Sequence, residues 1–431
     1  MRDTMKWFLI LAAILALLPL ETAAQQPSGK LVRVVMLSRH GVRSPTQSTE
    51  ALNGWRQPPL TPAWPDFGVP PGYLTPKGQV LVQEMGAYYR QYLDKAGLFQ
   101  PARCPDGVFI WADQDQRTLE TAQALGIGLA RENGACHFEV SKATDKIDPV
   151  FHPTEALPQC RLDPDRVREA VGDLDNLSGQ YKPQLDEAQT ILGCCSVKLC
   201  ENACNGLGDD TCTLPTLSSC AGAAKGQASI SGGFGVAQSF AEILLLQYAQ
   251  GFGGDNFGFG RADKASMLDT LQLHTAVFSK VQRAHYVSQR QGANLLYHIA
   301  YAVKNGRDPG TASGDNKFIA YVGHDTNIAN VAALLNLHWT AGKYSADDMP
   351  PGGALIFEVR QEPASVSAFF AAQSPDDMRN QMGEPDQVPV KIPRCGNSDR
   401  SCPLEDFVKP MAEFLKMTRP ILDSNRQCLT D

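Results

Sequence analysis

Three segments of this chain share one pattern, in which an apolar stretch is followed by a short charged segment and then by a helical pattern. We call the charged segment between strand and helix a corner. The stretches are residues 31–37, 106–113 and 318–322. The first is β-branched and apolar throughout except for Arg33, which is typical of a central strand covered on both faces. The alternation of such strands with helices predicts an α/β fold around an open sheet.

The corners carry side chains that can bind an anion or transfer a proton. They are Arg39, His40, Arg43, Arg117, His324 and Asp325. In open α/β sheets the carboxyl ends of the strands meet at one edge, where helix N-termini also point their free N–H groups. We therefore expect these six side chains to share one crevice, although they lie far apart in the chain.

The charges beside His40 suit a phosphate ester. Arg39 and Arg43 lower the pKa of this histidine, because nearby positive charge disfavours the imidazolium form. Guanidinium groups match phosphate oxygens, and a neutral imidazole is a competent nucleophile toward phosphorus. Asp325 adds an acid for the departing oxygen; a helix N-cap is its structural alternative, and one side chain can serve as both. The two distant corners together predict phosphoryl chemistry rather than a structural ion pair.

Residues 155–275 break the alternation of strands and helices. They contain helical patterns, a cysteine cluster and several glycines. We expect an inserted, smaller, mainly α-helical cap domain here, with the α/β domain built from residues 25–154 and 276–431. Strand patterns at residues 354–360 and 365–372 return to the sheet, which is expected to be mixed, mainly parallel and flanked by helices.

The first residues have the pattern of a signal peptide. Arg2 and Lys6 precede an apolar run at residues 7–20, and small residues follow up to Ala24. A membrane anchor is the alternative, but this run of 14 residues is shorter than the roughly 20 needed to cross a bilayer. We expect a signal peptide at residues 1–24, a periplasmic or secreted mature chain, and no membrane contact after cleavage.

The composition limits the partners and cofactors. Apolar residues make up 43% and charged residues 20%, as in ordinary globular proteins, and the net charge is -7. A negative chain disfavours a nucleic-acid partner, so an anion must bind at a local basic site. No dense cluster of His, Asp and Glu suits a two-metal site, and we expect no metal and no cofactor.

The cysteines indicate disulfides. The chain has 12 of them, and an oxidising compartment favours their pairing. Six crowd into one Gly/Asp-rich stretch, namely Cys194, Cys195, Cys200, Cys204, Cys212 and Cys220. Zinc is the alternative for this cluster, but its spacing lacks paired CxxC knuckles and no histidine lies nearby. Disulfides are favoured, and the pairing of the six stays open.

Two motifs resemble those of the histidine acid phosphatases. RHGVRSP at residues 39–45 is similar to their RHGxRxP signature, and GHDTN at 323–327 is similar to their distal HD motif. Segments at 64–78, 240–251 and 350–358 also resemble the bacterial periplasmic phytase and glucose-1-phosphatase branch, so the resemblance covers most of the mature chain. It implies a phosphoglycerate mutase-like α/β fold with an inserted helical domain.

The resemblance implies a role for each corner residue. His40 is the expected nucleophile, which forms a phosphohistidine, and Asp325 is the acid that protonates the leaving group before water releases phosphate. The implied phosphate-binding residues are Arg39, Arg43, Arg117 and His324. Such enzymes use no metal and work in acid, which fits an acid that must carry a proton to act.

The resemblance also implies three disulfides. The pairs are Cys104 with Cys136, Cys160 with Cys428, and Cys395 with Cys402. Relatives carry fewer cysteines in the inserted domain, so the six-cysteine cluster departs from the family pattern.

The expected substrate pocket departs from the phytase pattern too. The phytase branch has a lysine where this chain has Gln47, and an arginine where it has Gln291 or, one residue off, Arg290. Glu242 matches a position that approaches the substrate in relatives. The expected pocket residues are Thr46, Gln47, Glu242 and Arg290. Phytate is expected as one substrate, with sugar phosphates such as glucose 1-phosphate as the alternative.

Two other classes of protein share parts of this pattern. A non-catalytic phosphate-ester binding protein needs the arginines but neither His40 nor Asp325. Cytosolic mutases share RHG, but they have no signal peptide and no comparable cysteine content. We therefore expect an exported, monomeric acid phosphatase whose partner is a small phosphate monoester.

Overall fold

The computed structural model describes residues 29–130, 136–202, 204, 211–312, 314–382, 384–393, 395 and 401–418. The expected signal peptide, residues 1–24, lies outside these ranges and stays a prediction. None of the described helices combines the length and the apolar content needed to cross a bilayer.

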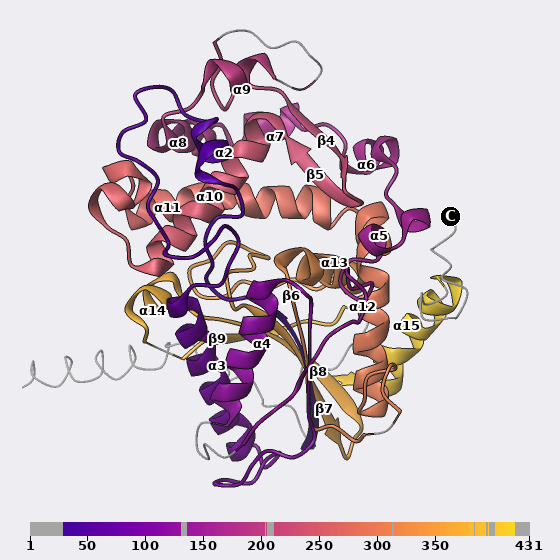
Figure 1. Ribbon diagram of the computed structural model, residues 1–431. Helices are drawn as coiled ribbons and strands as arrows, with labels where there is room; N and C mark the ends of the chain where they lie inside the picture. Colours follow the sequence, from indigo (N-terminus) through magenta and orange to yellow (C-terminus); the bar gives the residue numbers. More distant parts are fainter. Residues whose placement is uncertain are drawn as a thin grey trace, which may run out of the picture.

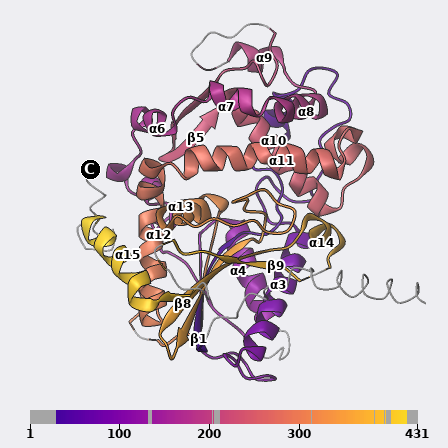
Figure 2. The same cartoon turned by 180° about the vertical axis from the view of Figure 1, so that it is seen from behind.

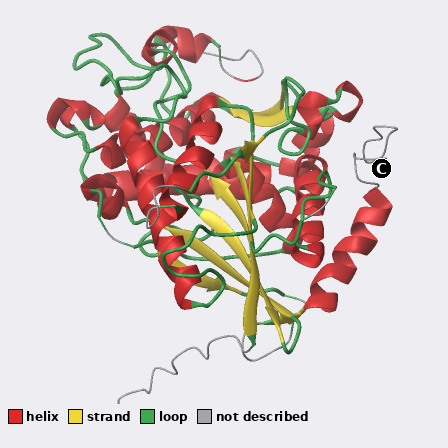
Figure 3. Ribbon diagram, turned by 60° about the horizontal axis from the view of Figure 1, so that its bottom comes forward, coloured by secondary structure: helices red, strands yellow, loops and turns green. Residues whose placement is uncertain are grey.

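A twisted sheet, with eight strands among the described residues, forms the centre of the molecule (Figures 1 and 3). The strand order is β10-β8-β7-β1-β6-β2-β3, and β9 pairs with β8. The parallel strands are β1 (Lys30–Arg39), β6 (Phe318–Gly323), β2 (Val108–Ala112) and β3 (Val140–Ser141). The strands with antiparallel pairing are β7 (Ala354–Gln361), β8 (Ser365–Ala372), β9 (Asp386–Val390) and β10 (Cys402–Pro403). The fold is mixed α/β, as expected.

The three strands predicted to precede charged corners are neighbours in this sheet. Strand β1 lies beside β6 with Arg39 opposite Gly323, and β6 lies beside β2 with Val322 opposite Ala112. All residues of β6 are buried, which suits its position between two parallel strands. The corners that follow the strands therefore leave the sheet at the same edge.

Alternate residues of β1 pack against different helices. Val34 and Met36 belong to the core on one side of the sheet, and Val35 and Leu37 belong to the core on the other side. The helices are α3 (Pro76–Lys95) and α4 (Gln116–Leu129) on the first side, and α12 (His285–Asn305), α13 (Asp325–Leu335) and α15 (Leu404–Thr418) on the second. Because both faces are covered, residues 34–37 at the centre of the strand are all apolar.

A mainly helical layer lies across the edge where the parallel strands end (Figures 1 and 2). Its helices are α5 (Pro153–Ala156), α6 (Pro164–Val171), α7 (Asp175–Gln180), α8 (Lys182–Leu192), α9 (Val197–Glu201), α10 (Gly232–Gln250) and α11 (Lys264–Val277). A hairpin of β4 (Ser219–Ala224) and β5 (Gln227–Ser231) joins this layer. Its Ala, Gly and Ser residues carry little strand propensity, so the sequence did not predict it. The cap-domain boundaries at 155 and 275 stay predictions.

Two short α-helices lie outside these layers. Helix α2 (Thr49–Asn53) lies in the long segment between the first corner and α3. Helix α14 (Pro375–Asn380) contacts α10 and so links the antiparallel part of the sheet to the helical layer.

Four disulfides join cysteines within the described ranges. They are Cys104–Cys136, Cys194–Cys195, Cys200–Cys212 and Cys395–Cys402. The first and the last are pairs that the family resemblance implies. The third implied pair includes Cys428, which lies outside the described residues, and stays a prediction. The two middle pairs favour disulfides over zinc in the cysteine cluster, because a disulfide sulfur is no thiolate ligand.

Candidate active site

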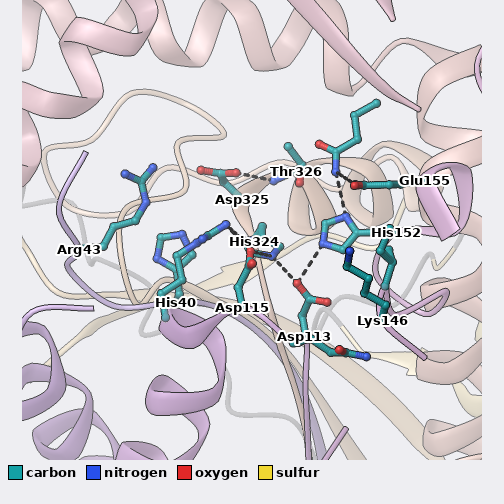
Figure 4. Close-up of a pocket in the computed structure, with 14 residues that line it drawn as sticks. His40, Arg43, Asp113, Asp115, Lys146, His152, Glu155, His324, Asp325 and Thr326 are labelled. Carbon is teal, nitrogen blue, oxygen red and sulfur yellow. Dashed lines mark hydrogen bonds and ion pairs between the residues drawn. The ribbon is translucent and has the colours of Figure 1, made fainter. Parts of the chain in front are cut away.

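A cavity of about 350 Å³ lies where β1, β6 and β2 end (Figure 4). The corner side chains that line it are His40, Arg43, Arg117, His324 and Asp325. The remaining one, Arg39, is only 1% exposed and contacts Asp325. The fold thus brings all six predicted side chains together, because three parallel strands end at one edge.

The His40 ring is held in one tautomer. Its Nδ1 lies 2.9 Å from the carbonyl oxygen of Gly41, which can only accept a hydrogen bond, so Nδ1 carries the proton and Nε2 has a free lone pair. Burial, followed by the charges of Arg117, Arg39 and Arg43, holds the pKa of His40 well below its usual range. The ring therefore stays neutral in mild acid and offers Nε2 as a nucleophile.

Two helices hold the segment that carries this histidine. The backbone N–H of Gly41 donates to Thr121 Oγ1 of α4 at 3.0 Å, and Thr75, which caps the N-terminus of α3, donates its own N–H to Val42 O at 3.0 Å. Helix α3 approaches so closely that a Cβ on Gly78 would lie 2.1 Å from Val42 O. Glycine at this position lets the helix pack against the backbone beside His40.

The two arginines of the first corner share one carboxylate, that of Glu242 on α10. Arg43 Nη2 donates to both of its oxygens at 3.0 Å, and Arg39 Nη2 pairs with the same side chain. Arg39 also donates to Met349 O at 2.5 Å. Although burial opposes ionisation, Arg43 and Arg39 hold the pKa of Glu242 far below its usual range. An anionic ligand of these arginines must therefore compete with Glu242.

The Arg117 guanidinium lies between the carboxylate of Asp115 and the imidazole of His324. Arg117 occupies the first turn of α4, and its Nη2 is 2.6 Å from Asp115 Oδ2 and 3.4 Å from His324 Nδ1. Its side chain is 19% exposed toward the cavity. The guanidinium is thus oriented for a third contact, such as a phosphate oxygen.

A buried carboxylate that the sequence analysis missed orients His324. Asp113 Oδ2 accepts a hydrogen bond from His324 Nε2 at 2.7 Å and another from His152 Nε2 at 3.0 Å. Although burial opposes ionisation, these bonds hold the pKa of Asp113 far below its usual range. Asp113 directly follows β2 and so had the same signal as the other corner residues, whereas His152 lies in no motif.

Asp325 is the first residue of α13, and the N-cap position belongs to His324 instead. The cap alternative for Asp325 is therefore wrong. Its Oδ1 accepts from the backbone N–H of Thr326 at 2.7 Å, and its Oδ2 lies 2.8 Å from Arg39 Nη2. Its side chain is 14% exposed and lines the cavity, so the carboxyl is accessible to a bound ester.

Comparison with known proteins agrees with this geometry. The model of the histidine phosphatase superfamily (branch 2) matches residues 30–373. This chain belongs to that superfamily. It is therefore a phosphatase, and the matched range includes both of the motifs at residues 39–45 and 323–327.

Phytases and glucose-1-phosphatases are among its relatives. Phytase AppA of Escherichia coli K12 is 34% identical over 362 residues, which cover 81% of each chain. A glucose-1-phosphatase of Providencia rettgeri is 27% identical over 413 residues, 90% of this chain and 92% of the relative. The Hafnia alvei phytase in complex with myo-inositol hexakis sulphate superposes with a TM-score of 0.78 at 30% identity, over 90% of this chain and 98% of that chain.

This histidine phosphatase places the expected substrate-pocket residues in different environments. Glu242 forms ion pairs with Arg39 and Arg43. Thr46 is exposed and bonds Gln47 at 3.2 Å, and neither side chain lines the cavity. The Arg290 guanidinium lies 5.0 Å from the ring centre of Tyr286, also outside the cavity. The role of these residues in substrate binding therefore stays a prediction.

Proposed function

We propose that this histidine phosphatase hydrolyses phosphate monoesters through a phosphohistidine formed on His40. The observation that carries the proposal is the 2.9 Å contact between His40 Nδ1 and Gly41 O, which leaves Nε2 of this ring free in a cavity lined by Arg43 and Arg117. A lone pair at that position is available for attack, and the arginines stabilise the charge that develops on the phosphoryl oxygens.

In the first step, His40 Nε2 attacks phosphorus, a P–N bond forms and the P–O bond to the alcohol breaks. Asp325 gives its proton to the departing oxygen, so the alcohol leaves neutral. In the second step, water attacks phosphorus and passes a proton to the Asp325 carboxylate. The P–N bond then breaks, its electron pair returns to His40, and inorganic phosphate leaves.

We propose phytate as a substrate. Two observations support it: the 34% identity to a phytase, and the similarity to a phytase that binds myo-inositol hexakis sulphate, in which sulphates replace the phosphates. Lys146 lines the cavity and adds a cation beyond the arginines, which suits a second phosphate of the same inositol ring.

Sugar monophosphates are the second candidate. Four carboxylates line the cavity, those of Asp113, Asp115, Glu155 and Asp325. Among the described lining residues, Lys146 is the one ammonium group beside these acids. A ligand with a single phosphate and several hydroxyls fits such a mixed surface, because carboxylates accept hydrogen bonds from sugar hydroxyls.

We also propose that the chain is exported after cleavage at Ala24 and acts as a periplasmic or secreted monomer. The basic and apolar order of the first residues supports export. The described disulfides support it as well, since such bonds persist in oxidising compartments.

The test is release of phosphate from p-nitrophenyl phosphate, phytate and glucose 1-phosphate between about pH 3 and about pH 8, with a chelator present. We expect turnover with an acidic optimum and no loss in the chelator. Equal rates for wild type and His40→Ala would contradict the nucleophile assignment. A much higher rate on glucose 1-phosphate than on phytate would favour the second candidate.

A further inference from the structure

We propose that Asp113, His152 and His324 bind a divalent transition-metal ion such as Zn²⁺, and that the bound ion inhibits the phosphatase. The binding is independent of the proposed function, whereas the inhibition rests on it and on the phosphate-binding role that the family resemblance implies for His324. The ion takes no part in the chemistry.

Three potential ligand atoms converge beside the cavity (Figure 4). Asp113 Oδ2 lies 2.7 Å from His324 Nε2 and 3.0 Å from His152 Nε2, and all three atoms lie within 4.8 Å of one another. A tetrahedral ion with bonds of about 2.0 to 2.1 Å sets neighbouring ligand atoms about 3.3 Å apart. One ion can therefore replace the two protons in the hydrogen bonds from His324 and His152 to Asp113, with only small movements of these three side chains.

The three side chains are held in place and yet accessible. Asp113 and His324 are buried, His152 has a side chain that is 15% exposed, and all three line the cavity. Ligands that are already ordered lose little conformational freedom on binding. The cavity supplies the entry path and space for a water ligand, which a metal site also requires.

Asp115 can complete the set of ligands. Its Oδ2 lies 3.6 Å from His324 Nε2, and its side chain is 47% exposed, so it can turn to an ion when that ion replaces its contact with Arg117 Nη2 at 2.6 Å. Two carboxylates balance a divalent charge and offset repulsion from Arg117, whose Nη2 is 3.4 Å from His324 Nδ1. Mixed imidazole and carboxylate ligands suit Zn²⁺ or Cu²⁺, whereas Mg²⁺ and Ca²⁺ prefer oxygen alone.

The other ring nitrogen of His152 has a partner that can fix the ring. Its Nδ1 lies 3.1 Å from Gln227 Nε2, which also donates to Glu155 Oε2 at 3.0 Å. When Nε2 of a neutral His152 binds an ion, the proton moves to Nδ1, and Gln227 must turn its amide to present the oxygen. Such outer partners orient metal-binding histidines in general.

A second cluster of three potential ligands in the site is less suited to a cation, because its carboxylates already pair with an arginine. Glu242, His274 and Asp325 also place their ligand atoms within 4.8 Å of one another. Arg39 pairs with both of these carboxylates, so a cation there would have to displace a buried guanidinium. Asp113 pairs with histidines instead, and these become ligands on losing a proton.

An ion on His324 Nε2 would change the phosphate site. The ring would then carry its proton on Nδ1, beside Arg117, where it can donate to a phosphate oxygen. This donor and the added positive charge would bind dianionic phosphate more tightly, because hydrogen bonds between charged groups are strong. Product would therefore leave more slowly, and turnover would fall.

Binding is tested by calorimetric titration of untagged, chelator-treated enzyme with ZnCl₂ at about pH 7, in buffer without phosphate. We expect one strong site per chain, and an affinity lower by at least about tenfold in His152→Asn. His338→Asn is the matched control, because His338 also bonds a carboxylate, that of Asp347, at 2.6 Å but lies outside the cavity. The control should bind like wild type. Equal affinity for wild type and His152→Asn would overturn the proposal.

A second measurement does not depend on the folding of a variant. Anomalous diffraction at the zinc edge, from wild-type crystals soaked in ZnCl₂, should give a peak between Asp113, His152 and His324. Peaks at other positions alone would overturn the binding site, whether or not the enzyme hydrolyses phytate.

Inhibition is measured with p-nitrophenyl phosphate, because phytate itself chelates metal ions. The wild-type rate should fall by about tenfold at saturating Zn²⁺ and recover when a chelator is added, whereas His152→Asn should need at least about tenfold more Zn²⁺ for the same fractional loss. An unchanged wild-type rate at a Zn²⁺ concentration that fills the calorimetric site would overturn the inhibition.

Discussion

Arg39 and Asp325 form an ion pair in which Nη2 of the arginine lies 2.8 Å from Oδ2 of the acid. Arg39 ends β1 and Asp325 begins α13, so the pair joins two of the strand ends that form the site. The same Nη2 also pairs with Glu242. A phosphoryl group that binds Arg39 therefore competes with two carboxylates, which couples substrate binding to the charge on the proposed acid.

Replacement of His40 by alanine should lower the rate on p-nitrophenyl phosphate by at least about 1,000-fold, because the reaction loses its nucleophile. Steady-state rates measure the loss. Labelled phosphoryl enzyme, trapped by rapid denaturation in alkali, should form in wild type and be absent from the variant. Label retained by a folded His40→Ala enzyme would assign the nucleophile to another side chain.

Asp325→Asn should slow hydrolysis of glucose 1-phosphate by about 100-fold or more, since the sugar oxygen leaves poorly without a proton. The same variant should lose much less rate on p-nitrophenyl phosphate, because nitrophenolate departs with little protonation. The ratio of the two rates is the measurement. A thermal melt serves as the control for folding, and equal slowing on both substrates would remove the acid role.

Glu242→Gln should bind inorganic phosphate about tenfold more tightly than wild type, because Arg39 and Arg43 lose the carboxylate that competes for them. Calorimetry measures this affinity. Glu155→Gln is the matched control, since it makes the same change of charge at a carboxylate that lines the cavity but bonds Gln227 rather than an arginine. Weaker phosphate binding by Glu242→Gln would show that this carboxylate supports the anion site instead of competing for it.

The stabilising effect of Glu242 should depend on pH. Although burial opposes ionisation, Arg43 and Arg39 depress the pKa of this carboxyl in the folded chain. Because the pKa is lower in the folded chain, the ionised carboxylate stabilises the fold, and this effect is complete above the pKa of a glutamate in the unfolded chain, about 4.3. The stabilisation is lost as the pH falls from there toward the pKa of the folded chain. The difference in free energy of unfolding between wild type and Glu242→Gln should therefore shrink on acidification. Urea titrations across this range measure it, and a constant difference would contradict the ion pairing.

Gly78→Ala should destabilise the fold by about 2 to 3 kcal/mol, because its Cβ would lie 2.1 Å from Val42 O and must push α3 away from the segment that carries His40. Urea unfolding measures the loss, and the rate on p-nitrophenyl phosphate should fall as well. Gly179→Ala on α7 is the matched control, since a Cβ there meets no atom within 4 Å. Equal stability of the two variants would show that α3 has room to move.

The amino-acid sequence by itself determined the strand and corner elements and the six corner side chains that lie together in the fold. Residues 318–322 are predominantly apolar, and His324 and Asp325 follow after Gly323, so neighbouring residues alone predict a buried strand that ends in a polar site. The same holds for residues 31–37 and the arginines after them. Parallel pairing then brings such ends together, because the strands share one direction and one register.

Only the tertiary structure decided which side chains meet. Asp113 accepts hydrogen bonds from both His152 and His324. Glu242 pairs with the arginines of the first corner from α10, a helix of the mainly helical layer. The Arg290 guanidinium packs over the ring of Tyr286, outside the cavity. The physical reason is that local patterns set the type of each element, whereas contacts between distant residues depend on how the helical layer packs across the sheet edge. Small differences in that packing move a side chain into the cavity or away from it.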